Sequence, residues 1–469
     1  MTNSKHTHVA DMTAVELSQL FQSKALSPVE ATQASLERIE QCNSSVNAYC
    51  FIAEQDALKA AKQSEARWFK AAPLSKIDGI PSSIKDLTSV AKWPSRSGSL
   101  TSSEDLAVVD APFTQKMRQA GAVILGKTTT PEFGWKGVTD SRLTGITRNP
   151  WKTTQTSGGS SGGAAVAAAL NMGVLHQASD AGGSIRIPAS FCGVFGIKPT
   201  FGYIPQWPAS AMTTLSHLGP ITRTVQDSLL MMDIVATPDI RDWYSNSVFS
   251  GTWSDANKQP LDGIKIAYSP TLGYVDVDPL ILKLIDVAVT SLEQLGAKVE
   301  RVTPNIQDPI DTFSTLWFAG AAKVISGFSQ KQRELLDPGF LKIGEQGSKI
   351  DIVDYMKAVE QRAELGRTMQ AFHSNYDILI TPTLPRTAFE AGQNTETQQQ
   401  KHWMDWTPFS YPFNLTQQPA LSIPCGQVNG LPVGLQIVAD RGNDLMAINI
   451  AKHIEDLIPT QFLDAPRIA

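Results

Sequence analysis

Cysteine is scarce in this sequence, and the motifs that usually hold zinc are absent. The 469 residues include only four cysteines, too few in so long a chain for a disulfide framework. There is no CxxC pair and no HExxH motif, so a zinc site has no support. We therefore expect neither a metal nor another cofactor. The cysteines are Cys42, Cys50, Cys192 and Cys425.

Long apolar runs and clusters of basic residues are also missing. The formal net charge is −5, and without a basic run we expect neither nucleic acid nor an anionic membrane as a partner. No stretch of about 20 apolar residues is present, as a membrane span would need. The first 12 residues lack the apolar centre of a secretory signal. The cytoplasm is the expected location.

What the chain does contain is alternating helix and strand patterns. Residues 108–126 predict a helix that ends at Gly121 and a buried strand after it. The same order returns later, with a helix starting at Asp278 and a strand over 298–302. This alternation is typical of an α/β protein.

We expect one α/β domain over residues 1–469, with its sheet completed by both halves of the chain. Its predicted parts are a helical arm over 1–70, a catalytic core over 75–236, and a remainder over 237–469 that completes the sheet and the substrate pocket.

The stretch from Thr156 to Pro188 is unusually rich in glycine and serine. It holds the pair Ser160–Ser161 and, further on, Ser184, each with glycines beside it. Such composition often marks a flexible linker. Here, however, the glycine–serine clusters flank an alanine-rich helical run and an isoleucine-rich segment, whereas a linker would have polar neighbours. Glycine allows close backbone approach, so the stretch predicts a backbone shaped around reacting hydroxyls.

Three chemistries compete for these serines. A phosphate-binding loop at a helix N-terminus is physically plausible, but neither GxxxxGK[ST] nor GxGxxG is present. An α/β-hydrolase nucleophile elbow matches formally, because residues 159–163 read GxSxG. That elbow needs an apolar strand directly before it, and residues 149–156 are not strand-like. No histidine after the stretch has a setting that marks it as the base.

The third chemistry is a serine nucleophile whose base is a lysine, reached through another serine. A short strand within residues 79–86 carries Lys85 directly after Ile84, in a segment that is otherwise apolar or small, and burial there would lower the pKa of its amine. A lone lysine is usually a solvated surface residue, so this position by itself is ambiguous. Ser184 follows Asp180-Ala-Gly-Gly, where consecutive amides can converge as an oxyanion hole requires. Ser160 would relay the proton between Ser184 and Lys85.

These residues resemble the amidase signature family over about residues 10 to 460. The matching segments are GGSSGG, SDAGGSIRIPA and FCGVFGIKPT, the lysine strand GIPSSIKD, and the later GPITRT and PALSIP. The resemblance implies a large, mixed, twisted β-sheet covered by helices on both faces. It also implies an amidase that hydrolyses a small-molecule amide, through an acyl-enzyme, to a carboxylic acid and ammonia or an amine.

The resemblance also implies roles for individual residues. Lys85, Ser160 and Ser184 match a Ser–Ser–Lys triad, with a cis peptide bond between Gly159 and Ser160. The backbone amides of the segment from Ala181 to Ser184 match the oxyanion hole, although alanine stands at 181 where the family often has threonine. The oxyanion donors are thus Ala181, Gly182, Gly183 and Ser184, and the supporting residues are Ser161, Ser179, Asp180 and Arg186.

The substrate remains open at this point. Gly134 and Trp135 are candidates for substrate contact, among other loop aromatics that could equally be core. The alternative function is the glutaminase subunit of a tRNA-dependent amidotransferase, where glutamine is expected at the position of Ile187. An inactive binding protein on the same scaffold is disfavoured because all three triad positions are filled. The sequence does not decide the oligomeric state and leaves a homodimer among the options.

Overall fold

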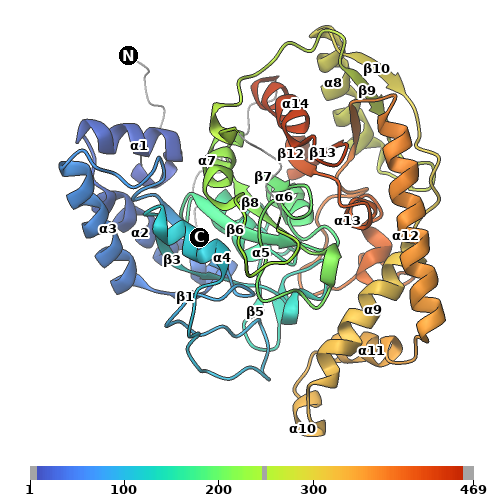
Figure 1. Cartoon of the computed structure of the whole chain (residues 1–469), viewed down its shortest axis with the longest axis horizontal. Helices are drawn as coiled ribbons and strands as arrows, with labels where there is room; N and C mark the ends of the chain where they lie inside the picture. Colours follow the sequence, from blue (N-terminus) through green and yellow to red (C-terminus); the bar gives the residue numbers. More distant parts are fainter. Residues whose placement is uncertain (1–7, 246–250, 458–469) are drawn as a thin grey trace.

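A large mixed sheet runs through the molecule in the computed structural model, which describes residues 8–245 and 251–457 (Figure 1). The strand order is β1-β3-β2-β6-β8-β7-β12-β13-β11-β9-β10. The strands of this sheet are β1 (Tyr49–Ile52), β2 (Pro81–Lys85), β3 (Val123–Thr128), β6 (Leu175–Asp180), β7 (Phe195–Lys198), β8 (His217–Thr222), β9 (Lys265–Tyr268), β10 (Lys298–Arg301), β11 (Ile378–Pro382), β12 (Ala420–Val428) and β13 (Leu431–Ala439). Two further strands, β4 (Asp140–Ser141) and β5 (Gly145–Ile146), pair with each other alone.

The sheet is mixed because its ends are largely parallel and its centre is antiparallel. β2 lies parallel to both β3 and β6, and β9 lies parallel to β10 and β11, whereas the strands from β6 to β13 pair antiparallel. β7 from the first half of the chain pairs with β12 near the end. This pairing across the middle of the sheet supports our proposal that both halves form one domain.

Helices cover both faces of the sheet, as predicted. On one face α5 and α6 contact each other and the central strands; on the other, α7, α8 and α14 do so. Figure 1 shows α1–α3 at one end of the sheet and α9, α11 and α12 at the other. The α-helices are α1 (Ala14–Ser23), α2 (Pro28–Val46), α3 (Glu54–Phe69), α4 (Pro112–Gln119), α5 (Gly162–Ala169), α6 (Arg186–Cys192), α7 (Val225–Val235), α8 (Pro279–Gln294), α9 (Ile310–Ser326), α10 (Gln330–Arg333), α11 (Pro338–Gly347), α12 (Ile352–His373), α13 (Pro412–Leu415) and α14 (Asp444–Leu457).

Local sequence signals explain where several helices begin. α8 starts with Asp278 as its N-cap and proline at its first position, as the sequence predicts. α5 differs from the surface helices because all its residues are buried. A run of alanines and glycines lets this helix pack closely against β6 and β8.

The neighbouring strands β2 and β6 end at the same edge of the sheet and place Lys85 and Asp180 there. β2 and β6 are parallel and adjacent, with Ser83 opposite His176. Because parallel neighbours end at the same edge of a sheet, Lys85 at the end of β2 and Asp180 at the end of β6 lie at one edge. α5 begins beside that edge, since it leads directly back into β6.

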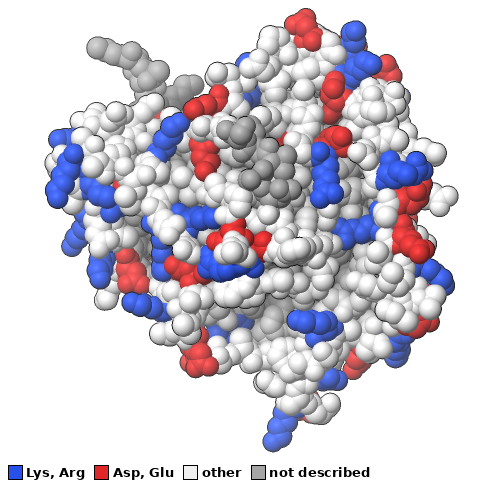
Figure 2. Space-filling view, in the orientation of Figure 1, with Lys and Arg blue, Asp and Glu red and all other residues white. Residues whose placement is uncertain are grey.

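Surface charge, membrane-spanning helices and metal-ligand clusters were the other features that could indicate a function. On the face shown in Figure 2, positive and negative side chains are interspersed. In the described ranges, no helix is both long and apolar enough to cross a membrane. Within the same ranges, no three His, Cys, Asp or Glu side chains are grouped so that they could hold a metal ion.

Candidate active site

Lys85 is completely buried, and its amine lies among three serine hydroxyls. The nitrogen is 2.7 Å from Ser160 Oγ, 2.8 Å from Ser161 Oγ and 3.0 Å from Ser179 Oγ. The backbone N–H of Lys85 donates to Gln177 Oε1 at 2.8 Å, which ties the end of β2 to β6. Lys85 is therefore no surface lysine. It is the centre of a buried polar cluster.

Burial has a direct electrostatic consequence for this amine. It lowers the pKa of Lys85 well below the ordinary value, because the charged form loses its hydration. The carboxylate of Asp180 acts in the opposite direction but is the weaker influence. Lowering the pKa increases the fraction of neutral amine near neutral pH, and a neutral amine has a lone pair that can accept a proton.

Ser160 and Ser161 lie directly before α5. The peptide bond between Gly159 and Ser160 is cis, which confirms that prediction. The Ser161 hydroxyl donates to the carbonyl oxygen of Ser179 at 3.1 Å, and the Ser161 N–H donates to the carbonyl oxygen of Ser184 at 3.2 Å. Ser161 thus links α5 with both β6 and the turn that carries Ser184.

Asp180 is the hub of the turn that follows β6. Its carboxylate accepts the backbone N–H of Gly183 at 2.8 Å and pairs with the Arg186 guanidinium at 2.9 Å, both inside the protein. Asn414 Nδ2 donates to the same carboxylate at 2.8 Å. Burial alone raises the pKa of Asp180, but the charge of Arg186 and the hydrogen bonds from Arg186 and Asn414 hold it below its ordinary value. The carboxylate therefore stays ionised and fixes the loop.

Ser184 lies in this loop and is almost fully buried. Its hydroxyl makes no hydrogen bond to another residue in the described part of the chain. The amides around it fall into two groups. The Gly183 N–H is taken by Asp180, whereas the N–H groups of Ala181, Gly182 and Ser184 have no partner among the described residues.

Aromatic side chains from two distant segments cover the loop. A Cβ at position 182 would lie 2.7 Å from Phe313 Cζ and 2.8 Å from Trp403 Cη2, so these rings rest directly on Gly182. Phe313 in turn stacks on Trp317 and Tyr411, at ring distances of 5.3 and 5.0 Å. Phe313 carries no local sequence signal, so only the tertiary structure identifies it.

The two residues predicted to contact substrate have different surroundings. Gly134 lies against the cluster, because a Cβ there would be 3.3 Å from Ser160 Oγ. Trp135 is buried with Phe340 at a ring distance of 6.3 Å, and packs on Gly339. The structure therefore brings Gly134 to the serines, while Trp135 belongs to the adjoining aromatic core.

No histidine takes the place of the lysine. In residues 8–245 and 251–457, none of the histidine hydrogen bonds reaches Ser160 or Ser184. His217, for example, donates from Nδ1 to the carbonyl oxygen of Leu215. The fold and this cluster together define the class of protein: an α/β protein whose candidate catalytic site consists of serines and a buried lysine.

Comparisons with known proteins identify the family within that class. Residues 30–448 match the family described as Amidase. An acylamidase from Rhodococcus erythropolis is 36% identical over 461 residues, 96% of this chain and 96% of that protein. A glutamyl-tRNA(Gln) amidotransferase subunit from Moorella thermoacetica is 31% identical over 452 residues, 91% of this chain and 92% of that protein.

A solved structure agrees with the sequence comparisons. A bacterial aryl acylamidase of the amidase signature enzymes has a TM-score of 0.90 and 28% identity, covering 96% of this chain and 97% of that one. The chain belongs to the amidase signature family, and it is a hydrolase that acts on amide carbon–nitrogen bonds. The acylamidase is a stronger match than the amidotransferase subunits, which favours the amidase over the glutaminase alternative.

Proposed function

We propose that this amidase uses Ser184 as nucleophile, Ser160 as proton relay and Lys85 as base to hydrolyse a small-molecule amide. The observation that carries the proposal is the buried Lys85 amine, 2.7 Å from Ser160 Oγ and next to the loop that holds Ser184. A lysine with a lowered pKa can act as a general base near neutral pH.

The hydrogen bonds around Lys85 support a direction for proton transfer. The Ser161 hydroxyl already gives its proton to the Ser179 carbonyl, so its oxygen must accept from the amine. A neutral amine has two N–H groups and one lone pair. We assign the second N–H group to Ser179, which leaves the lone pair for the Ser160 hydroxyl.

The proposed reaction uses this arrangement. Ser184 Oγ attacks the amide carbonyl carbon, its proton passes to Ser160, and the Ser160 proton passes to Lys85. The tetrahedral intermediate breaks its C–N bond as the proton returns through Ser160 to the leaving nitrogen. This step releases ammonia or an amine and leaves an ester on Ser184. Water attacks that ester in the same way, and the carboxylic acid is released.

The oxyanion of the tetrahedral intermediate needs backbone donors. We assign this role to the amides of Ala181, Gly182 and Ser184, which have no partner in the described chain, and not to Gly183, whose N–H is held by Asp180. Removal of one such donor typically costs about 3–4 kcal/mol of barrier. Asp180, paired with Arg186, positions this loop and does not itself take part in proton transfer.

The substrate proposal rests on the aromatic rings above the loop. Phe313 and Trp403 cover Gly182 with an apolar surface, which favours an uncharged, aromatic or bulky apolar group next to the scissile bond. Gly134 lies against Ser160 and is our candidate for backbone contact with the other part of the substrate. The names of the relatives, acylamidase and aryl acylamidase, agree with an acyl anilide as a first substrate to test.

Two experiments test this function. A fluorophosphonate probe should label the protein and fail to label the Ser184→Ala variant, whereas equal labelling would exclude Ser184 as the nucleophile. A panel of acyl anilides, primary amides and glutamine, assayed without any other protein present, should give turnover of the first two classes. Turnover of glutamine alone would favour the amidotransferase reading instead, and no turnover with no labelling would favour an inactive scaffold.

A further inference from the structure

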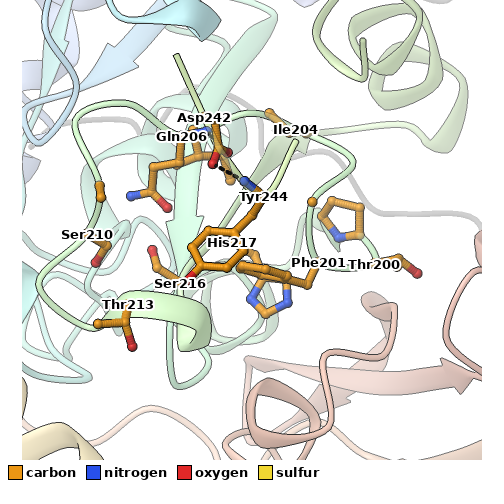
Figure 3. A pocket seen from close by; sticks show the side chains of 14 residues that line it. Thr200, Phe201, Ile204, Gln206, Ser210, Thr213, Ser216, His217, Asp242 and Tyr244 are labelled. Carbon is orange, nitrogen blue, oxygen red and sulfur yellow. Dashed lines mark hydrogen bonds between the residues drawn. The ribbon is translucent and has the colours of Figure 1, made fainter. Parts of the chain in front are cut away.

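The strands on the two sides of β6 pair with it over different lengths. β8 pairs with β6 from His176, opposite Ile221, to Asp180, opposite His217. His217 lines the pocket shown in Figure 3 and marks the end of this pairing. On its β8 side, β6 is therefore paired as far as its last residue.

On the other side, the pairing of β6 with β2 stops earlier. Its last pair is Ser83 with His176, so Lys85 lies beyond the paired part. β2 itself continues, because Lys85 still pairs with Thr128 of β3. The end of β2 that carries the lysine is thus attached to β3 by the regular ladder but not to β6.

The side-chain amide of Gln177 fills this break in the pairing. Gln177 lies on β6 and is fully buried, and its Oε1 accepts the Lys85 N–H at 2.8 Å. Its Nε2 donates to the carbonyl oxygen of Ala178 at 3.3 Å. The amide therefore lies between an N–H of β2 and a carbonyl of β6, and it takes the place of the direct bond that a continuous ladder would have.

Lys85 is bound to β6 at both ends of the residue. Gln177 holds its backbone N–H, and Ser179, two positions further along β6, lies 3.0 Å from its amine. The amine is also 2.7 Å from Ser160 Oγ, the contact that the proposed reaction uses. A general base needs to lie within hydrogen-bond reach of the proton it takes. The position of the Lys85 main chain therefore bears directly on the chemistry.

We propose that Gln177 is a positioning residue for the amidase reaction: its side-chain oxygen holds the main chain of Lys85 at the distance from β6 that brings the amine to Ser160. This inference rests on the proposed function, in which Lys85 is the base. The hydrogen bonds of the Gln177 side chain within the described chain go to the Lys85 N–H and to Ala178, so Gln177 acts through Lys85.

The test removes the oxygen and keeps the shape of the side chain. Gln177→Met has an unbranched side chain of similar length, and its sulfur is only a weak acceptor. The Lys85 N–H then loses its acceptor and the main chain can shift, and displacement of a reacting group by about 1 Å can cost about 10²-fold in rate. We expect kcat for an acyl anilide to fall by about 10- to 100-fold, with KM changed by less than about twofold, because no substrate contact is lost.

Gln418→Met is the matched control. Gln418 is also buried, and its amide likewise donates to a strand carbonyl, that of Ala439 at 2.9 Å. The control should lower the unfolding midpoint as Gln177→Met does, but it should leave kcat unchanged. An equal loss of kcat in the control, or a raised KM with unaltered kcat in Gln177→Met, would overturn the proposal.

A second, milder variant is less at risk of unfolding. Gln177→Asn keeps a buried amide, but its side chain is one methylene shorter, so its oxygen cannot stay 2.8 Å from the Lys85 N–H unless a strand moves. It should also lose kcat at unchanged KM, and normal kcat in either variant that folds would contradict the role of Gln177.

Lys85→Ala, assayed beside these variants, separates this inference from the proposed function. If Lys85→Ala is active, the assignment of the base is wrong and the role of Gln177 fails with it. If Lys85→Ala is inactive and the Gln177 variants keep normal kcat, only the role of Gln177 is wrong.

Discussion

Lys85 Nζ and Ser160 Oγ lie 2.7 Å apart inside the protein, although 75 positions separate the two residues in the chain. The parallel pairing of β2 with β6 and the start of α5 at the same sheet edge create this contact. A lysine and a serine in hydrogen-bond contact away from water are suited to exchange a proton, since no solvent competes for either group.

Removal of the Lys85 amine should abolish catalysis while the fold remains. Without its base, Lys85→Ala should lower kcat for an acyl anilide by about 10²- to 10⁴-fold. Lys76→Ala, at an exposed lysine far from the serines, is the control and should keep normal turnover. Thermal unfolding of both variants checks that they are folded. Near-normal turnover of Lys85→Ala at neutral pH would contradict the assignment of the base.

The activity should also report the titration of Lys85. Burial lowers the pKa of Lys85 well below its ordinary value, and the neutral form is the active base. Activity is therefore lost as the pH falls below the pKa that Lys85 has in the folded protein, and it is constant above that pKa. We expect kcat/KM to rise and level off well before about pH 10, where an ordinary lysine titrates. A profile that still rises near that pH would show an unperturbed lysine. Lys85→Arg, which cannot lose its proton, should be inactive throughout.

Much of the secondary structure, and the proximity of Lys85 to Ser160, could be predicted from the sequence, because both depend on segments with local patterns. The helix that starts at Asp278, the strand that ends at Lys85 and the glycine–serine stretch all have local signals. The hydrogen-bond partners of Arg186 have no such local signal. Asn414 and Gln436 bond to it from 228 and 250 positions away, and only the order of strands places them there.

The hydrogen bonds and contacts of individual residues in the loop could not be predicted from the sequence either. Four consecutive amides from 181 to 184 look alike in the sequence, but the Asp180 carboxylate turns back and takes only that of Gly183. Likewise Phe313 lies in an ordinary helical pattern and reaches Gly182 only through the packing of α9. Side-chain direction and helix packing are tertiary properties, so local patterns carry no information on them.

Breaking the buried pair of Asp180 and Arg186 should destabilise the protein. Both side chains are fully buried, 2.9 Å apart, and removal of one leaves the other as an unpaired buried charge. We expect Arg186→Met to lower the free energy of unfolding by about 3–5 kcal/mol, and to impair turnover because Asp180 then no longer fixes the loop. Denaturant unfolding measures the change. The control is Arg367→Met, which removes an exposed pair on α12 and should leave the unfolding midpoint unaltered. Equal midpoints for both variants would contradict this account.

A buried carboxyl on α7 should make stability depend on pH. Burial raises the pKa of Asp227 to about 6, above its value in the unfolded chain. The folded state therefore holds this proton more tightly, and the stabilisation present at low pH is lost as the pH rises through about 6. Relative to Asp227→Asn, the unaltered protein should gain stability as the pH is lowered from about 8 to about 4. The exposed Asp105→Asn is the control. Unfolding midpoints whose difference is the same at every pH would contradict the prediction.

Gly182 should tolerate no side chain, because its Cα faces the rings of Phe313 and Trp403. A Cβ there would lie less than 3 Å from both rings, so the loop must move, and displacement of a reacting group by about 1 Å can cost about 10²-fold in rate. We expect Gly182→Ala to lose activity by about that factor. The added change Phe313→Leu should restore part of the activity, since it removes the ring that the new methyl group meets. Gly366→Ala, on α12 with no atom within 4 Å of the new Cβ, should retain full kcat. If Gly182→Ala matched this control, the aromatic rings would not constrain the loop, and their assignment to the substrate site would lose its main support.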